Sequence, residues 1–142
     1  MTEPVPTRTP LPLAGLIGFR VELEPDVTQA HCILDIGDVH LNRHNVLHGG
    51  IISTLLDTAS GVTASLTVDD SGMTPFTTVS LNVNFLAPAT HGEVRAVGRL
   101  TGGGRSLQFI DCTLRDQNGR LIATSTGVFK RVKARAPEQS TS

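Results

Sequence analysis

The sequence predicts an α+β domain in which an antiparallel β-sheet packs against one long helix. Residues 50–66 carry apolar side chains at helical spacing over a longer stretch than any other part of the chain. Runs that alternate apolar and polar residues, as strands do, precede and follow this stretch, with turn residues between them. Because the helix and the strands are segregated along the chain, an antiparallel sheet is favoured over a parallel one.

Length and composition indicate a single domain. The chain has 142 residues, of which 39% are hydrophobic and 18% are charged, and this suits one globular core. Trp and Tyr are absent, so the core is expected to consist mainly of Leu, Ile, Val and Ala. We place the domain at residues 13–133, between a Pro- and Thr-rich disordered segment at residues 1–12 and a flexible polar tail at residues 134–142.

Two strands are expected before the long helix. A short helix or turn over residues 13–19 leads to a first strand that begins at Arg20. Pro25 and Asp26 mark the turn to a second strand at about residues 29–36. One face of that strand is apolar, and the other carries His31 and Asp35.

The long helix is expected to have two different faces. On a wheel of about 100° per residue, its apolar stripe covers an arc of about 140°. The stripe consists of Ile51, Ile52, Leu55, Leu56, Ala59, Val62, Thr63 and Leu66. The opposite face is made of small and hydroxylic residues around one carboxylate: Gly50, Ser53, Thr54, Asp57, Ser60, Gly61 and Ala64. The apolar stripe is expected to cover the sheet, and the uncovered faces of helix and sheet point to an oligomer.

Four strands are expected after the helix, arranged as a meander. Alternation predicts them at about residues 79–85, 93–100, 107–114 and 121–132. Three consecutive glycines at residues 102–104 form one turn, and Asp-Gln-Asn-Gly at residues 116–119 is a strong hairpin signal.

Charge, cysteine content and hydropathy exclude several classes of function. The net charge of −1 provides no field for nucleic acid, and no run is long enough to span a membrane. Cys32 and Cys112 are expected to be buried thiols, and the five histidines have no metal-ligand spacing, so we expect neither a metal nor a cofactor. The Pro-rich N-terminus is a poor signal peptide, so a cytoplasmic location is expected.

The segment from Asn42 to Asp57 carries the candidate chemistry. Gly49 and Gly50 enter the helix, where exposed N–H groups and the helix dipole suit a developing oxyanion, although glycines also simply permit tight turns. Asp57 lies mid-helix among small residues, which suits a pocket with a nucleophile or general base, although a lone carboxylate is usually solvated. His48 is either a hydrogen-bonding loop residue or part of the site. The residues alone leave these alternatives open.

The spacing resembles that of the hotdog-fold thioesterases of the phenylacetate-degradation type. The resemblance is carried by Asn42, the run His48-Gly49-Gly50 and Asp57, and by the later segments 78–89, 104–106 and 119–123. It covers about residues 13–132 and implies a hotdog fold, with an antiparallel sheet wrapped around one long central helix and paired into a dimer with a continuous sheet.

The same resemblance implies hydrolysis of an acyl-CoA thioester. Asp57 is then the nucleophile or the base that activates water, and the Gly49 N–H is the oxyanion donor. Asn42 and His48 orient the thioester and the sulfur leaving group, and a hydroxyl at Thr78 positions water.

One geometric argument places the site between two chains. Gly49 and Asp57 are eight residues apart, which is roughly 12 Å along one helix axis. Both must lie within about 3 Å of neighbouring atoms of one carbonyl group. A single helix cannot achieve this, whereas two helices antiparallel across a two-fold axis can. A homodimer or homotetramer is therefore the expected working unit.

Because CoA is a polyanion, basic residues are expected at the entrance to its site. Arg105 beside Ser106 is the first candidate, Lys130 or Arg131 is the second, and Gly50 is expected to contact the substrate. Two alternative functions remain: a non-catalytic acyl-CoA-binding module, and an enoyl-CoA hydratase or dehydratase of the same fold. No nucleic acid or membrane partner is expected.

Overall fold

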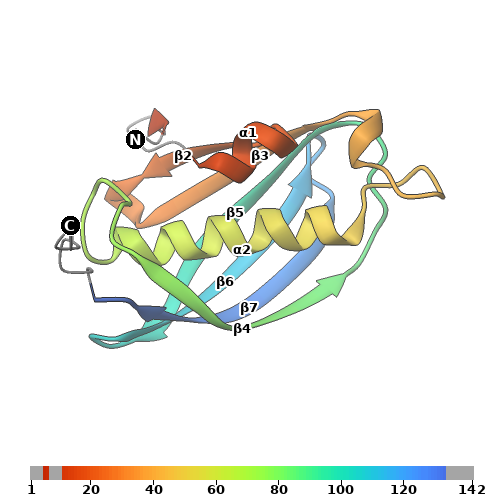
Figure 1. Cartoon of the computed structure of the whole chain (residues 1–142). Coiled ribbons are helices and arrows are strands. Elements are labelled where there is room, and N and C mark those ends of the chain that lie inside the picture. Colours follow the sequence, from red (N-terminus) through yellow and green to blue (C-terminus); the bar gives the residue numbers. More distant parts are fainter. Residues whose placement is uncertain (1–4, 7–10, 134–142) are drawn as a thin grey trace, which may run out of the picture.

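The computed structural model describes residues 5–6 and 11–133. A curved antiparallel sheet wraps around one long helix, which confirms the predicted α+β class (Figure 1). The elements, with two short 3₁₀ turns, are β1 (Val5–Pro6), α1 (Pro12–Ile17), β2 (Arg20–Glu24), η1 (Pro25–Val27), β3 (Gln29–Ile36), η2 (Asp38–His40), α2 (Gly49–Leu66), β4 (Phe76–Phe85), β5 (Gly92–Gly103), β6 (Leu107–Asp116) and β7 (Leu121–Arg131).

The order of strands differs from the expected meander at β4. Within the described residues the order is β1-β2-β3-β5-β6-β7-β4, with antiparallel pairing throughout. The last three strands in sequence do form a meander, but β4 pairs with β7, so the prediction that it continues the meander is wrong. Just after β4, Leu86 and Ala87 both donate N–H groups to the carbonyl of Ile122 in β7. Because β4 stands last in the described order, it is an edge strand of the sheet.

Helix α2 lies in the concave face of the sheet and makes a close contact with β5. Gly98 of β5 permits it, since a Cβ at this position would lie 2.2 Å from Thr63 Oγ1 and 2.9 Å from the Ala59 carbonyl oxygen. Thr63 Oγ1 donates to that carbonyl (2.7 Å) and accepts from the Ala30 N–H of β3 (3.0 Å). The helix is therefore bonded to one strand and closely packed against another.

The division of α2 into a buried and an open face is only partly confirmed. Ser60 and Ala64 were expected on the open face, but both are completely buried. Ile51 and Val62 were expected in the buried stripe but are only partly buried. The sheet curves around the helix and contacts more of it than one stripe, and Ala64 packs in a cluster with Phe129 of β7. The face that remains open carries Asp57.

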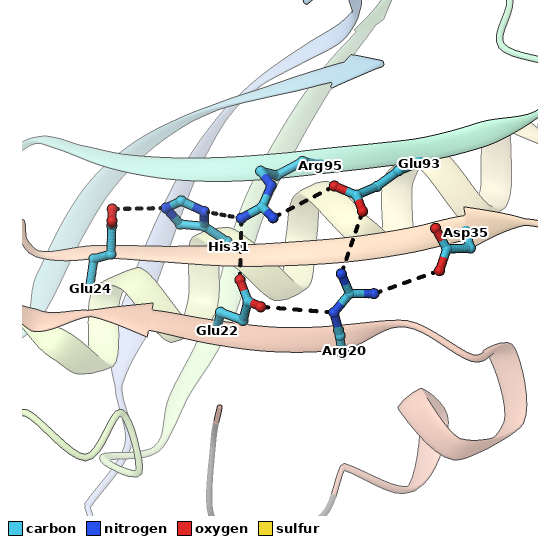
Figure 2. Close-up of polar contacts among 7 residues, drawn as sticks. All are labelled: Arg20, Glu22, Glu24, His31, Asp35, Glu93 and Arg95. Carbon is cyan, nitrogen blue, oxygen red and sulfur yellow. Dashed lines mark hydrogen bonds and ion pairs between the residues drawn. The ribbon is translucent and has the colours of Figure 1, made fainter. Parts of the chain in front are cut away.

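The outer surface of β2, β3 and β5 is covered by a network of charged residues (Figure 2). Arg95 Nη1 donates to Nδ1 of His31 (2.7 Å), and the other ring nitrogen, Nε2, contacts a carboxylate oxygen of Glu24 (3.0 Å). Because a guanidinium cannot accept a hydrogen bond, Nδ1 is the acceptor, and neutral His31 carries its proton on Nε2. The network continues through Glu22, Glu93, Arg20 and Asp35. This surface therefore needs no covering layer.

Both cysteines are free and buried, as the sequence predicts. Burial raises the pKa of the Cys112 thiol to about 12, and it also raises the pKa of Cys32, with a smaller contribution from the neighbouring Cys112. Both thiols are therefore protonated near neutral pH and serve as core residues.

The two ends of the chain are described only in part. Val5 and Pro6 pair with Leu23 and Glu22 of β2, and α1 begins at Pro12. The rest of residues 1–10 and the tail at 134–142 lie outside the described residues, so the disorder expected there stays a prediction. No helix in the described part of the chain is long and apolar enough to cross a membrane.

Candidate active site

The N-terminus of α2 is capped by a histidine side chain. His48 is the N-cap residue, and its Nδ1 accepts the Gly50 N–H (2.8 Å). A Cβ at position 50 would lie 3.0 Å from the same Nδ1, a tight contact that would require the imidazole to shift. The cap occupies the Gly50 N–H, whereas Gly49 is the first residue of the helix, and its N–H has no acceptor within the helix. Of the two glycines, Gly49 is therefore the one whose N–H the His48 cap leaves available.

The loop before α2 is held rigidly by the backbone and by Asn42. Asn42 Oδ1 accepts N–H groups from His44 (2.9 Å) and Val46 (3.3 Å), so this oxygen stabilises the loop itself. Backbone bonds from Leu47 to the Ala89 carbonyl (2.7 Å) and from His48 to the His40 carbonyl (2.9 Å) fix the helix entrance. The Gly49 N–H is thus presented from an ordered position.

The structure brings Asp57 and Thr78 together across 21 residues of sequence. Thr78 Oγ1 donates to Asp57 Oδ1 at 2.7 Å. The β4–β7 register shifts between Thr78 and Ser80, so Val79 is an extra residue in β4. Such a bulge re-aims the neighbouring side chains. Asp57 is therefore not a freely solvated carboxylate, because a hydroxyl of the edge strand donates to it.

A cavity of about 320 Å³ opens beside this pair. Asp57 and Thr78 lie on its wall, which continues along α2 and under the loop before β4. The remaining lining residues are small or apolar for the most part: Leu11, Thr58, Gly61, Val62, Ser65, Ser71, Gly72, Met73, Thr74, Pro75, Phe76 and Phe129. The carboxylate is thus placed where an uncharged group has room to lie against it.

A second cavity, of about 560 Å³, is basic. Arg105, Ser106, Arg131 and Lys133 line it, together with Thr74, Pro75 and Val132, and no carboxylate lies among these described residues. Arg131 N–H donates to the Ser106 carbonyl (2.8 Å), which holds the two basic strand ends together. Lys130 is not among the lining residues, so the structure brings Arg131 rather than Lys130 to Arg105.

The sequence did not indicate several of these neighbours. Met73 follows no motif, and only the folded chain shows that it lines a cavity. Lys133 is part of a basic run with Lys130 and Arg131 in the sequence, but only the fold places it beside Arg105. Phe85 lies against Gly49, since a Cβ at Gly49 would be 3.3 Å from its ring. Within the described residues no group of three or more His, Cys, Asp or Glu side chains is placed to hold a metal ion.

The long helix enclosed by an antiparallel sheet is the hotdog fold, here with a carboxylate on the open face of the helix. The profile of the thioesterase superfamily matches residues 44–123, which include the helix entrance, Asp57 and Thr78. The chain therefore belongs to the thioesterase superfamily and is a thioesterase.

Relatives of known structure and sequence agree with this assignment. The BH2602 protein from Bacillus halodurans, solved with CoA, is 28% identical, with a TM-score of 0.79, covering 90% of this chain and 83% of that one. A phenylacetic acid degradation-related protein from Ralstonia eutropha is 27% identical, with a TM-score of 0.74, covering 86% and 92%. Acyl-coenzyme A thioesterase 13 of Homo sapiens is 31% identical over 94 residues, which are 65% of this chain and 65% of that protein.

Proposed function

We propose that this thioesterase hydrolyses acyl-CoA at sites shared between two protomers, with Asp57 as the key carboxylate. The hydrogen bond from Thr78 to Asp57 beside the 320 Å³ cavity is the observation that carries the proposal. The named relatives support the substrate class, since one is an acyl-coenzyme A thioesterase and another was solved with CoA.

The reaction needs an attack on the thioester carbonyl and a donor for the resulting oxyanion. Asp57 either takes a proton from water as the water oxygen bonds to the carbonyl carbon, or attacks that carbon itself and is released by water in a second step. The Gly49 N–H stabilises the negative oxygen. The C–S bond then breaks, and the CoA sulfur leaves as a thiolate and takes up a proton. Neutral His48 accepts at Nδ1, so it carries a proton on Nε2 that can be donated toward the sulfur, and Asn42 keeps the loop in place.

Two protomers are needed because of the distance along α2. Gly49 and Asp57 of one chain are separated by roughly 12 Å of helix axis. The edge strand β4 supports self-association, since it pairs only with β7 among the described strands and exposes Val79 and Phe85, each 57% accessible. Pairing two copies of β4 side by side continues the sheet and brings two α2 helices together, antiparallel to one another.

The basic cavity is the proposed site for the phosphates of CoA. None of Arg105, Arg131 and Lys133 makes an ion pair with a described carboxylate, so their charges are available to an anion. The Ser106 hydroxyl and these cations match the oxygens of a phosphate.

Thiol release from a panel of acyl-CoAs tests the proposal. Asp57→Asn and Asp57→Ala are expected to abolish release while the oligomer, measured by size-exclusion chromatography with light scattering, persists. Undiminished hydrolysis by either variant would exclude Asp57 as the key group. Tight binding of acyl-CoA by the wild-type protein with no thiol released would instead indicate a binding module.

A further inference from the structure

The cavity beside Asp57 differs chemically from the basic cavity. Asp57 is the only charged residue among its described lining, and Val62, Met73, Phe76 and Phe129 give it an apolar wall. The phosphates of CoA fit the basic cavity instead. An uncharged acyl group fits the apolar cavity, because burial there removes apolar surface from water without burying an unpaired charge.

We propose that the acyl group lies in this cavity and that Gly61 sets the size of acyl group the enzyme accepts. The inference rests on the proposed function and adds to it a substrate class, compact aryl or medium-chain acyl groups. Gly61 follows Asp57 by four residues, so it lies one turn further along the same face of α2 and lines the cavity.

The volume of the cavity indicates how large an acyl group one protomer can enclose. About 30 Å³ is the share of one water molecule in the liquid, so 320 Å³ holds roughly ten non-hydrogen atoms. Octanoyl and phenylacetyl groups each have nine such atoms, whereas a palmitoyl group has seventeen and exceeds this space.

Packing against neighbouring atoms does not require glycine at position 61. A Cβ there would lie 3.9 Å from the Phe129 ring, its nearest described neighbour, which is an ordinary contact distance. Glycine is a poor residue in the middle of a helix, and alanine would favour the helix more. The missing side chain leaves open space in the cavity instead of relieving a clash, as expected for a residue that makes room for a ligand.

The far wall of the cavity is fixed by hydrogen bonds. Asp69 accepts from the hydroxyls of Ser71 and Thr74, and the Ser65 hydroxyl on α2 donates to the Thr74 carbonyl. Val132 N–H donates to the Pro75 carbonyl at 2.9 Å, which ties the loop to the end of β7. A wall held from both sides cannot retreat freely, so filling the space at Gly61 should exclude large acyl groups.

The test is the size selectivity of Gly61→Ala and Gly61→Val. We would measure kcat/KM by thiol release for acetyl-, octanoyl-, phenylacetyl- and palmitoyl-CoA. The wild type should prefer octanoyl- or phenylacetyl-CoA to palmitoyl-CoA. Valine adds three heavy atoms, roughly 90 Å³ at the same share per atom. It should therefore lower the ratio of octanoyl to acetyl activity by about 10- to 200-fold, the range for misplaced methylene-sized groups. Alanine should lower that ratio less and raise the urea midpoint.

Gly15→Ala is the matched control, since Gly15 is also helical, has no neighbour within 4 Å of a Cβ and does not line the cavity. It should leave all four activities unchanged. A preference for palmitoyl-CoA, or a ratio in Gly61→Val within twofold of the wild type, would overturn the inference but leave the proposed function standing. An equal loss for every acyl group would also overturn it, because the cavity would then hold the part common to all substrates. If the wild type releases thiol from none of them, the proposed function itself fails.

Discussion

The hydrogen bond from Thr78 to Asp57 gives a prediction whose magnitude follows from the structure. Thr78→Val keeps the shape of the side chain and removes the hydroxyl that donates at 2.7 Å. A hydrogen bond to a charged group contributes about 1.5–3 kcal/mol. Solvent reaches both side chains, so we take the lower end, about 1.5 kcal/mol, which corresponds to roughly a tenfold loss of kcat if the bond orients Asp57 for the reaction.

Steady-state thiol release measures this loss of kcat. Two further variants show whether the loss comes from the missing Thr78 hydroxyl. Thr77→Val is the control, because Thr77 is exposed on the same strand and none of the described hydrogen bonds uses its hydroxyl. It should retain wild-type activity. Thr78→Ser restores the hydroxyl and should recover most of the rate. Equal activities for Thr78→Val and Thr77→Val would refute the idea that Thr78 positions Asp57.

Three further predictions concern stability and reactivity. Gly98→Ala places a Cβ 2.2 Å from Thr63 Oγ1 and should lower the free energy of unfolding by about 1–3 kcal/mol or more in urea titrations, and a loss below 0.5 kcal/mol would contradict the packing described. Cys32 and Cys112, whose pKa values burial raises, should react with a thiol reagent only in denaturant, and rapid labelling of the native protein would contradict their burial. Hydrogen bonds from Ser71 and Thr74 lower the pKa of Asp69 to about 2. These bonds therefore add to the free energy of unfolding above about pH 3.8, and this contribution is lost as the pH falls towards 2. The Asp69→Asn variant should not show this loss of stability at low pH. An NMR titration midpoint near 4 for Asp69 would contradict the lowered pKa.

Much of the fold could be predicted because its signals are local. The 3.6-residue period of α2 and the alternation of the strands depend on neighbours in sequence, and both correctly placed the main elements. The partner of β4 is different, since alternation identifies a strand without saying which strand it pairs with. The same applies to Ser60 and Ala64: a helical wheel marks the apolar stripe but does not show that the sheet curves beyond it.

The candidate site also has one part that the sequence could predict and another that depends on the fold. Gly49 and Asp57 are on one continuous segment, so their spacing and their positions on the helix were visible in the sequence. Arg105, Arg131 and Lys133 meet only because β6 and β7 pair in a particular register, with Leu107 opposite Lys130. That register also turns Lys130 away from the cavity and Arg131 toward it, since alternate side chains of a strand point to opposite faces. Without this register, Lys130 and Arg131 could not be told apart as candidates for the cavity.

Mixing two inactive variants tests most directly whether the site is shared between protomers. Gly49→Pro removes the proposed oxyanion N–H at a helical position that tolerates proline, and the extended backbone of His48 (φ −62°, ψ 134°) suits a following proline. Asp57→Asn removes the carboxylate from the other side of the site. Each variant alone should be inactive.

The two variants are mixed, unfolded and refolded together. The activity of the mixture then distinguishes a site shared between protomers from a site within one chain. If Gly49 of one protomer serves Asp57 of its partner, each mixed dimer contains one intact site. Random mixing gives half mixed dimers, so about a quarter of the wild-type activity should return. If both groups act within one chain, every site lacks one of them, and a mixture that remains inactive would contradict the shared site.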